Sequence, residues 1–157
     1  MGWQTFSGKK ISDDIYHVVE EAIIREKENG HRLRICVGTD SKVNARMIHF
    51  ATAIVFVREK QGGFIFINQS HLARKGLQLK ERLILEVGKS VEIAYHMMGI
   101  LEEYRIPLEI HADINTDKNS GSYVALKEAL SYIKGMGFHY KLKPDAFASS
   151  SCADKYV

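Results

Sequence analysis

The sequence predicts an α/β fold with a five-stranded mixed sheet and one additional helix at its N-terminal side. Three segments rich in β-branched and aromatic residues follow one another closely between residues 33 and 69, which is typical of an antiparallel meander. After them, helical and extended patterns alternate, which indicates strands joined by crossover helices. The expected order is a helix followed by β-β-β-α-β-α-β-α. Because the 157 residues show no internal repeat and no linker, we expect one domain over residues 1–157.

The N-terminal half is predicted to contain the additional helix and the meander. Ser12 is a suitable N-cap, and apolar residues recur at helical spacing from Ile15 to Ile23. Asn29 and Gly30 end this helix. The three strands are expected at residues 33–40, 48–58 and 64–69, with a turn at 41–46 and a hairpin turn at 61–63.

The C-terminal half is predicted to alternate helices and strands. A long apolar stripe predicts a helix over residues 77–104. Gly137 ends the next helix, and Pro144 ends the last strand. The elements expected after the long helix are a strand at 108–113, a helix at 122–136, a strand at 138–142 and a helix at 146–157.

Composition excludes several classes of protein. The chain is 45% hydrophobic and 26% charged with a net charge of +3, which allows a polyanionic partner without requiring one. The two cysteines lack zinc-binding spacing. Neither a nucleophile elbow nor a glycine-rich phosphate loop is present. Because no apolar run approaches the roughly 18 residues of a membrane span and the start lacks a secretory signal, we expect a cytosolic, reduced protein with no membrane partner.

Two aspartates stand where predicted strands end. Asp40 follows an apolar run, and Asp113 ends the strand at 108–113. If the first meander strand pairs in parallel with that strand, both aspartates lie at one carboxyl-terminal edge, where open α/β sheets place their sites. Adjacent carboxylates repel unless they share a proton or bind a cation. Oxygen ligands without a cysteine or histidine cluster indicate Mg²⁺ or Mn²⁺.

In element order and in the positions of these aspartates, the chain resembles the ribonuclease H-like superfamily, and more specifically the YkuK-type family within it. The segments that carry the resemblance are VGTDS at 37–41, RLILEVGKS at 82–90, HADIN at 111–115 and KPDAFASSSCADK at 143–155. The resemblance implies a nuclease in which carboxylates hold two divalent ions. One ion activates water and the other stabilises the leaving oxygen of a phosphodiester. The implied partner is nucleic acid, whether RNA, an RNA–DNA hybrid or DNA.

The resemblance assigns catalytic and metal-binding roles to Asp40, which matches the aspartate that bridges both ions, and to Asp113. A third acid is expected from the long helix. Glu86 is preferred there because small residues follow it at positions i+4 and i+8 and let the helix approach the sheet. Glu81, in the first turns of the same helix, is the alternative, and for either residue pairing with nearby cations on a solvated face is the competing interpretation.

The fourth acid is a choice between two aspartates near the C-terminal end of the sequence. Asp154 resembles the aspartate of an Ala-Asp pair on the terminal helix of ribonuclease H, and it is the preferred candidate for catalysis and metal binding. Asp145 directly follows the last predicted strand and is the alternative, although its position also suits a cap for the final helix.

Four further residues are candidates for substrate binding. They are Ser41, His71, Arg74 and Lys75. Cations at the entry to the long helix are able to hold phosphates, although a solvated loop explains them equally well. For His111 we favour a buried, hydrogen-bonded role over a role in the site. The alternative function is a noncatalytic module that binds nucleic acid or protein on the same fold.

Overall fold

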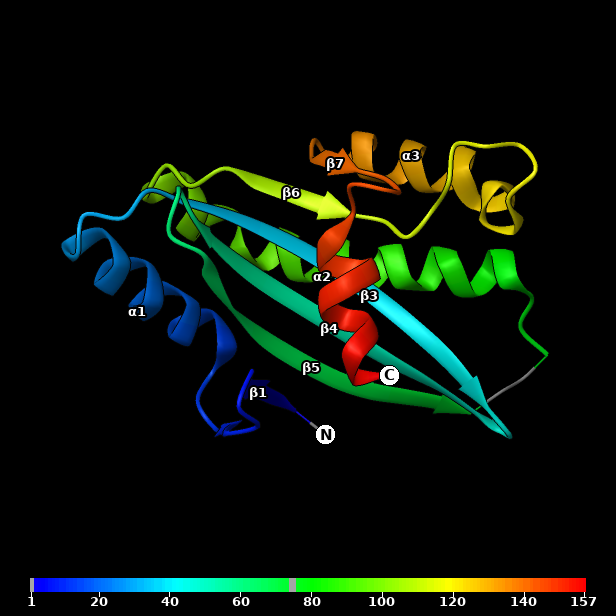
Figure 1. Cartoon of the computed structure of the whole chain (residues 1–157), viewed down its shortest axis with the longest axis horizontal. Coiled ribbons are helices and arrows are strands. Elements are labelled where there is room, and N and C mark those ends of the chain that lie inside the picture. Colours follow the sequence, from blue (N-terminus) through cyan, green and yellow to red (C-terminus); the bar gives the residue numbers. More distant parts are fainter. Residues whose placement is uncertain (1, 74–75) are drawn as a thin grey trace.

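A mixed sheet of seven strands organises residues 2–73 and 76–157, the part of the chain that this computed structural model describes (Figure 1). Its strand order is β2-β1-β5-β4-β3-β6-β7. The strands are β1 (Trp3–Thr5), β2 (Lys10–Ile11), β3 (Leu33–Asn44), β4 (Met47–Arg58), β5 (Gly63–Ala73), β6 (Leu108–His111) and β7 (His139–Lys141). The prediction of a mixed sheet is confirmed, but the prediction of five strands is wrong. Strands β1 and β2 were not expected because each is too short to show a two-residue periodicity.

The meander β3-β4-β5 is antiparallel as predicted, but its strands are longer than predicted. Strand β3 does not end at Asp40. It continues in register with β4 as far as the pair Asn44 and Met47, so the turn consists of Ala45 and Arg46 alone. The ladder satisfies backbone groups that an earlier turn would leave unpaired. Strand β5 likewise continues beyond the expected end at residue 69.

Strand β3 lies between β4 and β6, and it is parallel to β6, as predicted. The register places Cys36 opposite Glu109 and Gly38 opposite His111. Strand β6 ends at His111 rather than at Asp113, so Asp113 lies just beyond the strand. Strand β7 pairs in parallel with β6 and forms the edge of the sheet.

Three α-helices cover one face of the sheet and form the larger hydrophobic core with it (Figure 1). They are α1 (Ile15–Glu28), α2 (Leu79–Glu103) and α3 (Leu126–Gly135), the last preceded by the 3₁₀ segment η1 (Gly121–Ala125). A hydrogen bond between the hydroxyls of Ser90 and Thr39, 2.7 Å apart, holds helix α2 against the centre of the sheet. None of the helices in the described ranges is long and apolar enough to span a membrane.

The C-terminal segment packs on the opposite face of the sheet over a smaller core that includes Cys36 and Ala51. It was predicted to be an α-helix but consists of the π-helical segment η2 (Ala148–Ala153) and the 3₁₀ segment η3 (Asp154–Tyr156). The hydroxyls of Ser149 and Ser150 both donate to the carbonyl oxygen of Ala146, at 3.0 and 2.8 Å, and such bonds compete with regular α-helical hydrogen bonding.

Close contact between this segment and the sheet depends on Gly38. A Cβ atom at this position would overlap the backbone of Ala148 and Ser149. Any side chain at residue 38 would therefore push η2 away from β3. Since η2 continues directly into η3, Gly38 also determines how closely Asp154 approaches the sheet.

Candidate functional site

Four carboxylates from four different elements converge near the middle of β3. Asp40 lies on β3, Glu86 on α2, Asp113 just after β6, and Asp154 at the start of η3. Asp113 and Asp154 both act on the pKa of Asp40, and Asp40 and Asp113 both act on the pKa of Glu86. We call these four residues the carboxylate cluster.

Asp40 is the central member of the carboxylate cluster. Burial, a hydrogen bond with the Asp154 side chain and the charges of Asp113 and Asp154 together raise its pKa to about 7, and burial contributes most. The Ser41 backbone N–H donates to Asp40 Oδ1 at 2.9 Å and opposes the shift. A carboxyl group with such a pKa holds a proton near neutral pH, unless a cation replaces it.

Glu86 is only 4% exposed, although it carries a carboxyl group. Burial, with smaller contributions from the charges of Asp40 and Asp113, raises its pKa to about 8. The Ser41 hydroxyl, which donates to Glu86 Oε1 at 2.5 Å, opposes this rise. Arg82 lowers the pKa to a smaller extent. Ser41 therefore contacts two members of the carboxylate cluster, through its backbone and through its hydroxyl.

Asp113 contributes a buried oxygen that lacks a hydrogen bond. Its Oδ1 atom has no hydrogen-bond partner within the described residues. Lys143 Nζ lies 3.3 Å from this oxygen and forms an ion pair with it, but the pair does not have hydrogen-bond geometry. A buried carboxylate oxygen in this condition retains lone pairs for a further electropositive group.

The donor set fits a hard divalent cation, because all four residues offer carboxylate oxygens and Asp113 Oδ1, although paired with Lys143, accepts no hydrogen bond within the described residues. No three of the four carboxylates place oxygens within 4.8 Å of one another. Asp40, Glu86, Asp113 and Asp154 are the residues that would hold such an ion.

The structure separates the preferred candidates from the alternatives. Glu81 is exposed, and its carboxylate accepts the Gln78 backbone N–H at 3.4 Å as part of a capping box at the start of α2. Asp145 is exposed in the turn before η2, where its backbone N–H donates to Leu142. Neither residue is among the main causes of the raised pKa values of Asp40 and Glu86, whereas Asp154, although exposed, is a main cause for Asp40.

The proposed substrate-binding residues fall in different places. Ser41 faces the carboxylate cluster, as its bonds to Asp40 and Glu86 show. His71 is exposed near the end of β5. Arg74 and Lys75 lie outside the described residues.

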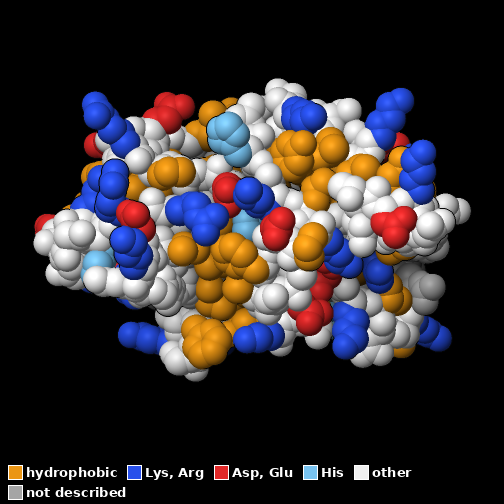
Figure 2. Space-filling view, turned by 45° about the horizontal axis from the view of Figure 1, so that its top comes forward, with side chains coloured by type: hydrophobic (Ala, Val, Ile, Leu, Met, Phe, Trp, Pro, Cys, Tyr) orange, Lys and Arg blue, Asp and Glu red, His pale blue; other side chains and the backbone are white. Residues whose placement is uncertain are grey.

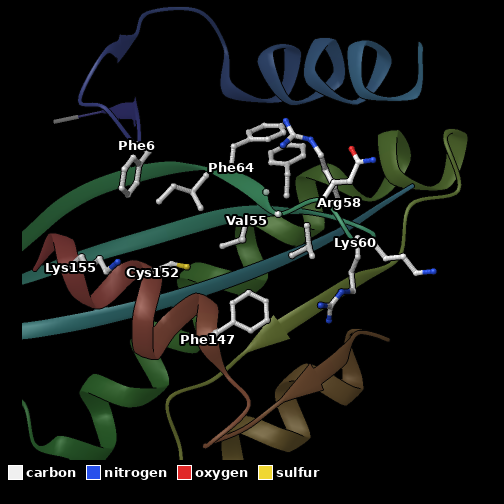
Figure 3. A pocket seen from close by; sticks show the side chains of 15 residues that line it. Phe6, Val55, Arg58, Lys60, Phe64, Phe147, Cys152 and Lys155 are labelled. Carbon is white, nitrogen blue, oxygen red and sulfur yellow. The ribbon is translucent and has the colours of Figure 1, made fainter. Parts of the chain in front are cut away.

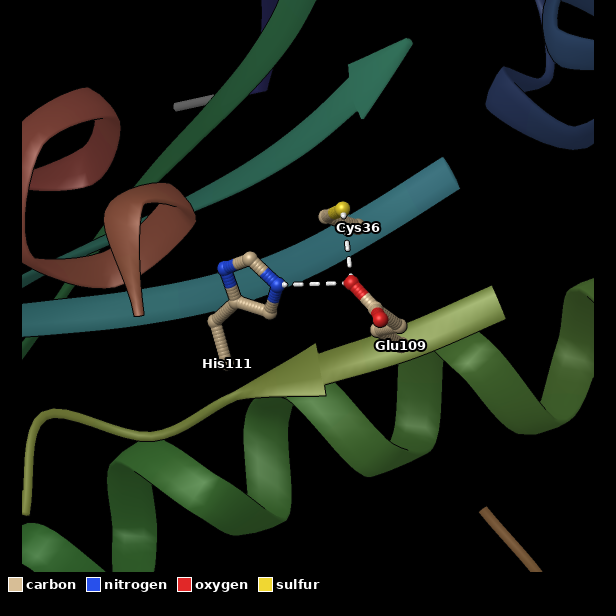
Figure 4. Close-up of side chains that lie close together, drawn as sticks. All are labelled: Cys36, Glu109 and His111. Carbon is tan, nitrogen blue, oxygen red and sulfur yellow. Dashed lines mark hydrogen bonds and ion pairs between the residues drawn. The ribbon is translucent and has the colours of Figure 1, made fainter. Parts of the chain in front are cut away.

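A second group of ionisable side chains, which the sequence did not predict, lies on the same face of the sheet as Asp40 (Figure 4). Cys36, Glu109 and His111 place their ligand atoms within 4.8 Å of one another. Glu109 Oε1 lies 3.6 Å from Cys36 Sγ, 3.3 Å from His111 Nε2 and 2.8 Å from Arg34 Nη1. The parallel register, which puts these residues on one face, is the signal that sequence reasoning would have needed.

The hydrogen bonds of this second group leave little capacity for a metal ion. The Ala148 backbone N–H donates to His111 Nδ1 at 3.1 Å, so the ring proton of a neutral His111 lies on Nε2 and points to Glu109. Burial raises the pKa of the Cys36 thiol to about 12, which keeps it protonated. The prediction of a buried, hydrogen-bonded His111 is confirmed, since the residue is 1% exposed.

An apolar groove occupies the other end of this sheet face, beside the N-terminal part of β3 (Figure 3). It has a volume of about 670 Å³ and is bordered by cations, and its lining includes Val55, Phe64, Phe147, Cys152 and Lys155. In Figure 2, hydrophobic side chains gather on this side of the molecule with Lys and Arg side chains around them. No carboxylate is among the lining residues, so the groove is separate from the carboxylate cluster.

Comparison with known proteins agrees with this fold and arrangement. The sequence profile of the family described as Ribonuclease H-like matches residues 14–157. The chain is also 27% identical over 136 residues to the uncharacterized protein YkuK of Bacillus subtilis (strain 168), and the match covers 78% of each chain. No solved structure matches the sequence.

The chain therefore belongs to the Ribonuclease H-like family. Within that family it is similar to YkuK. Both resemblances predicted from the sequence are confirmed.

Proposed function

We propose that this protein is a divalent-metal-dependent nuclease that hydrolyses a phosphodiester bond in nucleic acid, and that residues 1–157 form a single domain for this purpose. The observation that supports the proposal most strongly is the convergence of Asp113, Asp154 and Glu86 on Asp40. Burial, together with Asp154 and Asp113, raises the pKa of the Asp40 carboxyl group to about 7. Strongly raised pKa values that arise from burial together with like charges are typical of functional sites.

In this proposal Asp40, Glu86, Asp113 and Asp154 bind two Mg²⁺ or Mn²⁺ ions. When bound, the ions supply an activated water and stabilise the leaving oxygen of the phosphodiester. Ser41 orients two of the carboxylates, because it donates to Asp40 through its backbone and to Glu86 through its hydroxyl. The substrate class is nucleic acid, and RNA, an RNA–DNA hybrid and DNA all present the phosphodiester that this chemistry requires.

A cleavage assay tests the proposal. Wild-type protein is incubated with Mg²⁺ or Mn²⁺ and with RNA, hybrid, single-stranded and branched DNA substrates, beside the variant Asp40→Asn. Asparagine keeps an oxygen for the Ser41 N–H, so the fold is expected to remain while cleavage is lost. The matched control is Asp145→Asn, an exposed aspartate outside the carboxylate cluster that should cleave like wild type.

The outcomes separate two functions. Metal-dependent cleavage by wild type and by Asp145→Asn, but not by Asp40→Asn, supports the nuclease. Equal cleavage by Asp40→Asn and wild type contradicts it. Binding of nucleic acid in EDTA without cleavage under any condition would instead support a noncatalytic binding module.

A further inference from the structure

Three basic or hydrogen-bonding side chains stand in a line across three neighbouring strands. Lys42 on β3 lies opposite His49 on β4, and His49 lies opposite His71 on β5. The two imidazole rings are 6.3 Å apart between centroids. We call these three residues the basic row.

The basic row lies next to Asp40, on the same face of the sheet. Asp40 lies opposite Ala51, which lies opposite Gln69, and this level of the sheet is two residues away from the basic row on each strand. Residues two apart on a strand share a face and are about 7 Å apart. A chain bound along β3 would therefore pass from one set of residues directly to the other.

The η3 segment lies against the sheet at the level of Asp40 and Gln69, next to the basic row. The Gln69 side chain donates to the Tyr156 carbonyl oxygen at 2.7 Å, so η3 covers the level of Asp40 and Gln69. Beyond that point β3, β4 and β5 continue as a ribbon past the segment (Figure 1). Lys42 and His71 are exposed and His49 is partly exposed, so the basic row is open to a ligand.

The two faces of this ribbon differ in chemistry. The face opposite the basic row carries Val43, Ile48 and Leu72, and Ile48 is only 1% exposed. On the face of the basic row, no residue of the row forms an ion pair with a carboxylate in residues 2–73 and 76–157. The row thus presents an ammonium group and two imidazoles whose donors are available to an anion.

We propose that the basic row binds the phosphodiester backbone of a nucleic-acid strand and holds it beside the carboxylate cluster. This inference rests on the proposed nuclease function. Lysine ammonium groups and imidazole N–H groups donate to phosphate oxygens, and such contacts position a strand without reading its sequence. The basic row offers no aromatic surface other than its imidazoles, so contact with the backbone dominates over base stacking. The bound strand follows β3, with one phosphate at the basic row and the scissile phosphate at Asp40.

The test measures binding rather than cleavage. Asp40→Asn protein in EDTA is titrated into fluorescently labelled RNA and DNA oligonucleotides over a range of salt concentrations. Lys42→Gln, His49→Gln and His71→Gln, each added to Asp40→Asn, should weaken binding by about 3- to 10-fold. Lys42→Gln should also reduce the slope of log affinity against log salt concentration by about one, because one fewer counterion is released on binding. The matched control is Lys60→Gln, at the groove end of the same sheet, which should leave binding unchanged.

The outcomes also distinguish failure of this inference from failure of the nuclease proposal. Loss of binding in the row variants supports the basic row even if wild type cleaves no substrate, in which case only the nuclease proposal fails. Cleavage by wild type together with unchanged binding in all three row variants overturns the basic row alone. Failure of Asp40→Asn protein to bind any oligonucleotide, or equal loss with Lys60→Gln, also overturns it.

Discussion

Asp40 and the group of Cys36, Glu109 and His111 lie on the same face of the sheet, only a few residues apart along β3, while Glu86 reaches the carboxylate cluster from α2 on the other face. The second group is satisfied by the protein itself, because three donors converge on Glu109 Oε1 and the Ala148 N–H satisfies His111 Nδ1. In the carboxylate cluster, by contrast, acids face other acids and Asp113 Oδ1 has no hydrogen-bond partner among the described residues.

This difference separates a structural role from a functional one. In the second group the opposite charges and hydrogen bonds from His111 and Arg34 outweigh burial and lower the pKa of Glu109. In the carboxylate cluster burial and like charges act together and raise the pKa values of Asp40 and Glu86. A protein retains such unfavourable interactions where a ligand offsets them, whereas a satisfied network stabilises the fold by itself.

Loss of metal affinity is the largest effect we expect, and it should be confined to the carboxylate cluster. Glu86→Gln and Asp154→Asn should each lower the affinity for Mn²⁺ by at least about 10- to 100-fold, the range in which loss of even a supporting residue falls. Isothermal titration calorimetry on the folded variants measures this affinity directly.

The chain provides a matched control for each substitution. Glu81→Gln changes an exposed glutamate on the same helix as Glu86, and Asp145→Asn changes an exposed aspartate near Asp154 in the sequence. Both control variants should bind Mn²⁺ like wild type. If Glu81→Gln or Asp145→Asn loses the metal while its counterpart keeps it, the assignment of that carboxylate is wrong.

The next effect is a dependence of stability on pH that only the carboxylate cluster produces. The pKa values of Asp40 and Glu86 rise from 3.8 and 4.5 to about 7 and about 8 on folding. Between the unfolded and folded values the native state binds more protons than the unfolded chain, so the free energy of unfolding falls as pH rises. Thermal melts in EDTA should therefore show a lower melting temperature at about pH 8.5 than at about pH 6.5.

The double variant Asp40→Asn/Glu86→Gln isolates this effect, because it removes both titrating groups. It should lose most of the difference between the two pH values. Mn²⁺ should also reduce the difference in wild type, since the cation takes the place of the protons. A wild-type melting temperature that rises over this pH range, in EDTA and relative to the double variant, would contradict the raised pKa values.

The sequence was sufficient to predict the parallel pairing of β3 with β6, because an apolar run ending near an aspartate occurs twice. It did not predict that β3 continues to Asn44, since Ser41 and Lys42 break the apolar pattern while cross-strand pairing with β4 maintains the strand. Tertiary pairing outweighs local pattern in such a ribbon. The basic row depends on this extension and so was not visible from the sequence.

The sequence predicted those acids of the site whose place in a helix or at the end of a strand could be read from spacing. Spacing along α2 favoured Glu86, which is buried beside Asp40. Spacing gave no basis for the Cys36, Glu109 and His111 group, because it requires the exact register of two parallel strands and the approach of Ala148. The approach of Ala148 in turn depends on Gly38, whose role is visible only when η2 is placed on the sheet.

The smallest effect we expect is the converse of the first, a loss of stability without a loss of metal binding. Glu109→Gln replaces the carboxylate that accepts from Arg34, Cys36 and His111, and it should lower the free energy of unfolding by about 1–3 kcal/mol. Urea denaturation in EDTA measures this change. The matched variant Asp40→Asn should be as stable as wild type or more stable in EDTA, because it removes a buried acid that faces other acids.

Mn²⁺ affinity distinguishes the two groups a second time. Glu109→Gln should bind Mn²⁺ like wild type, whereas Asp40→Asn should not bind it measurably. If Glu109→Gln instead loses Mn²⁺ affinity and keeps its stability, then Cys36, Glu109 and His111 form a metal site, and the Ala148 N–H bond does not fix the His111 tautomer as inferred. The group of Cys36, Glu109 and His111 would then be the functional site, and the carboxylate cluster would have a structural role.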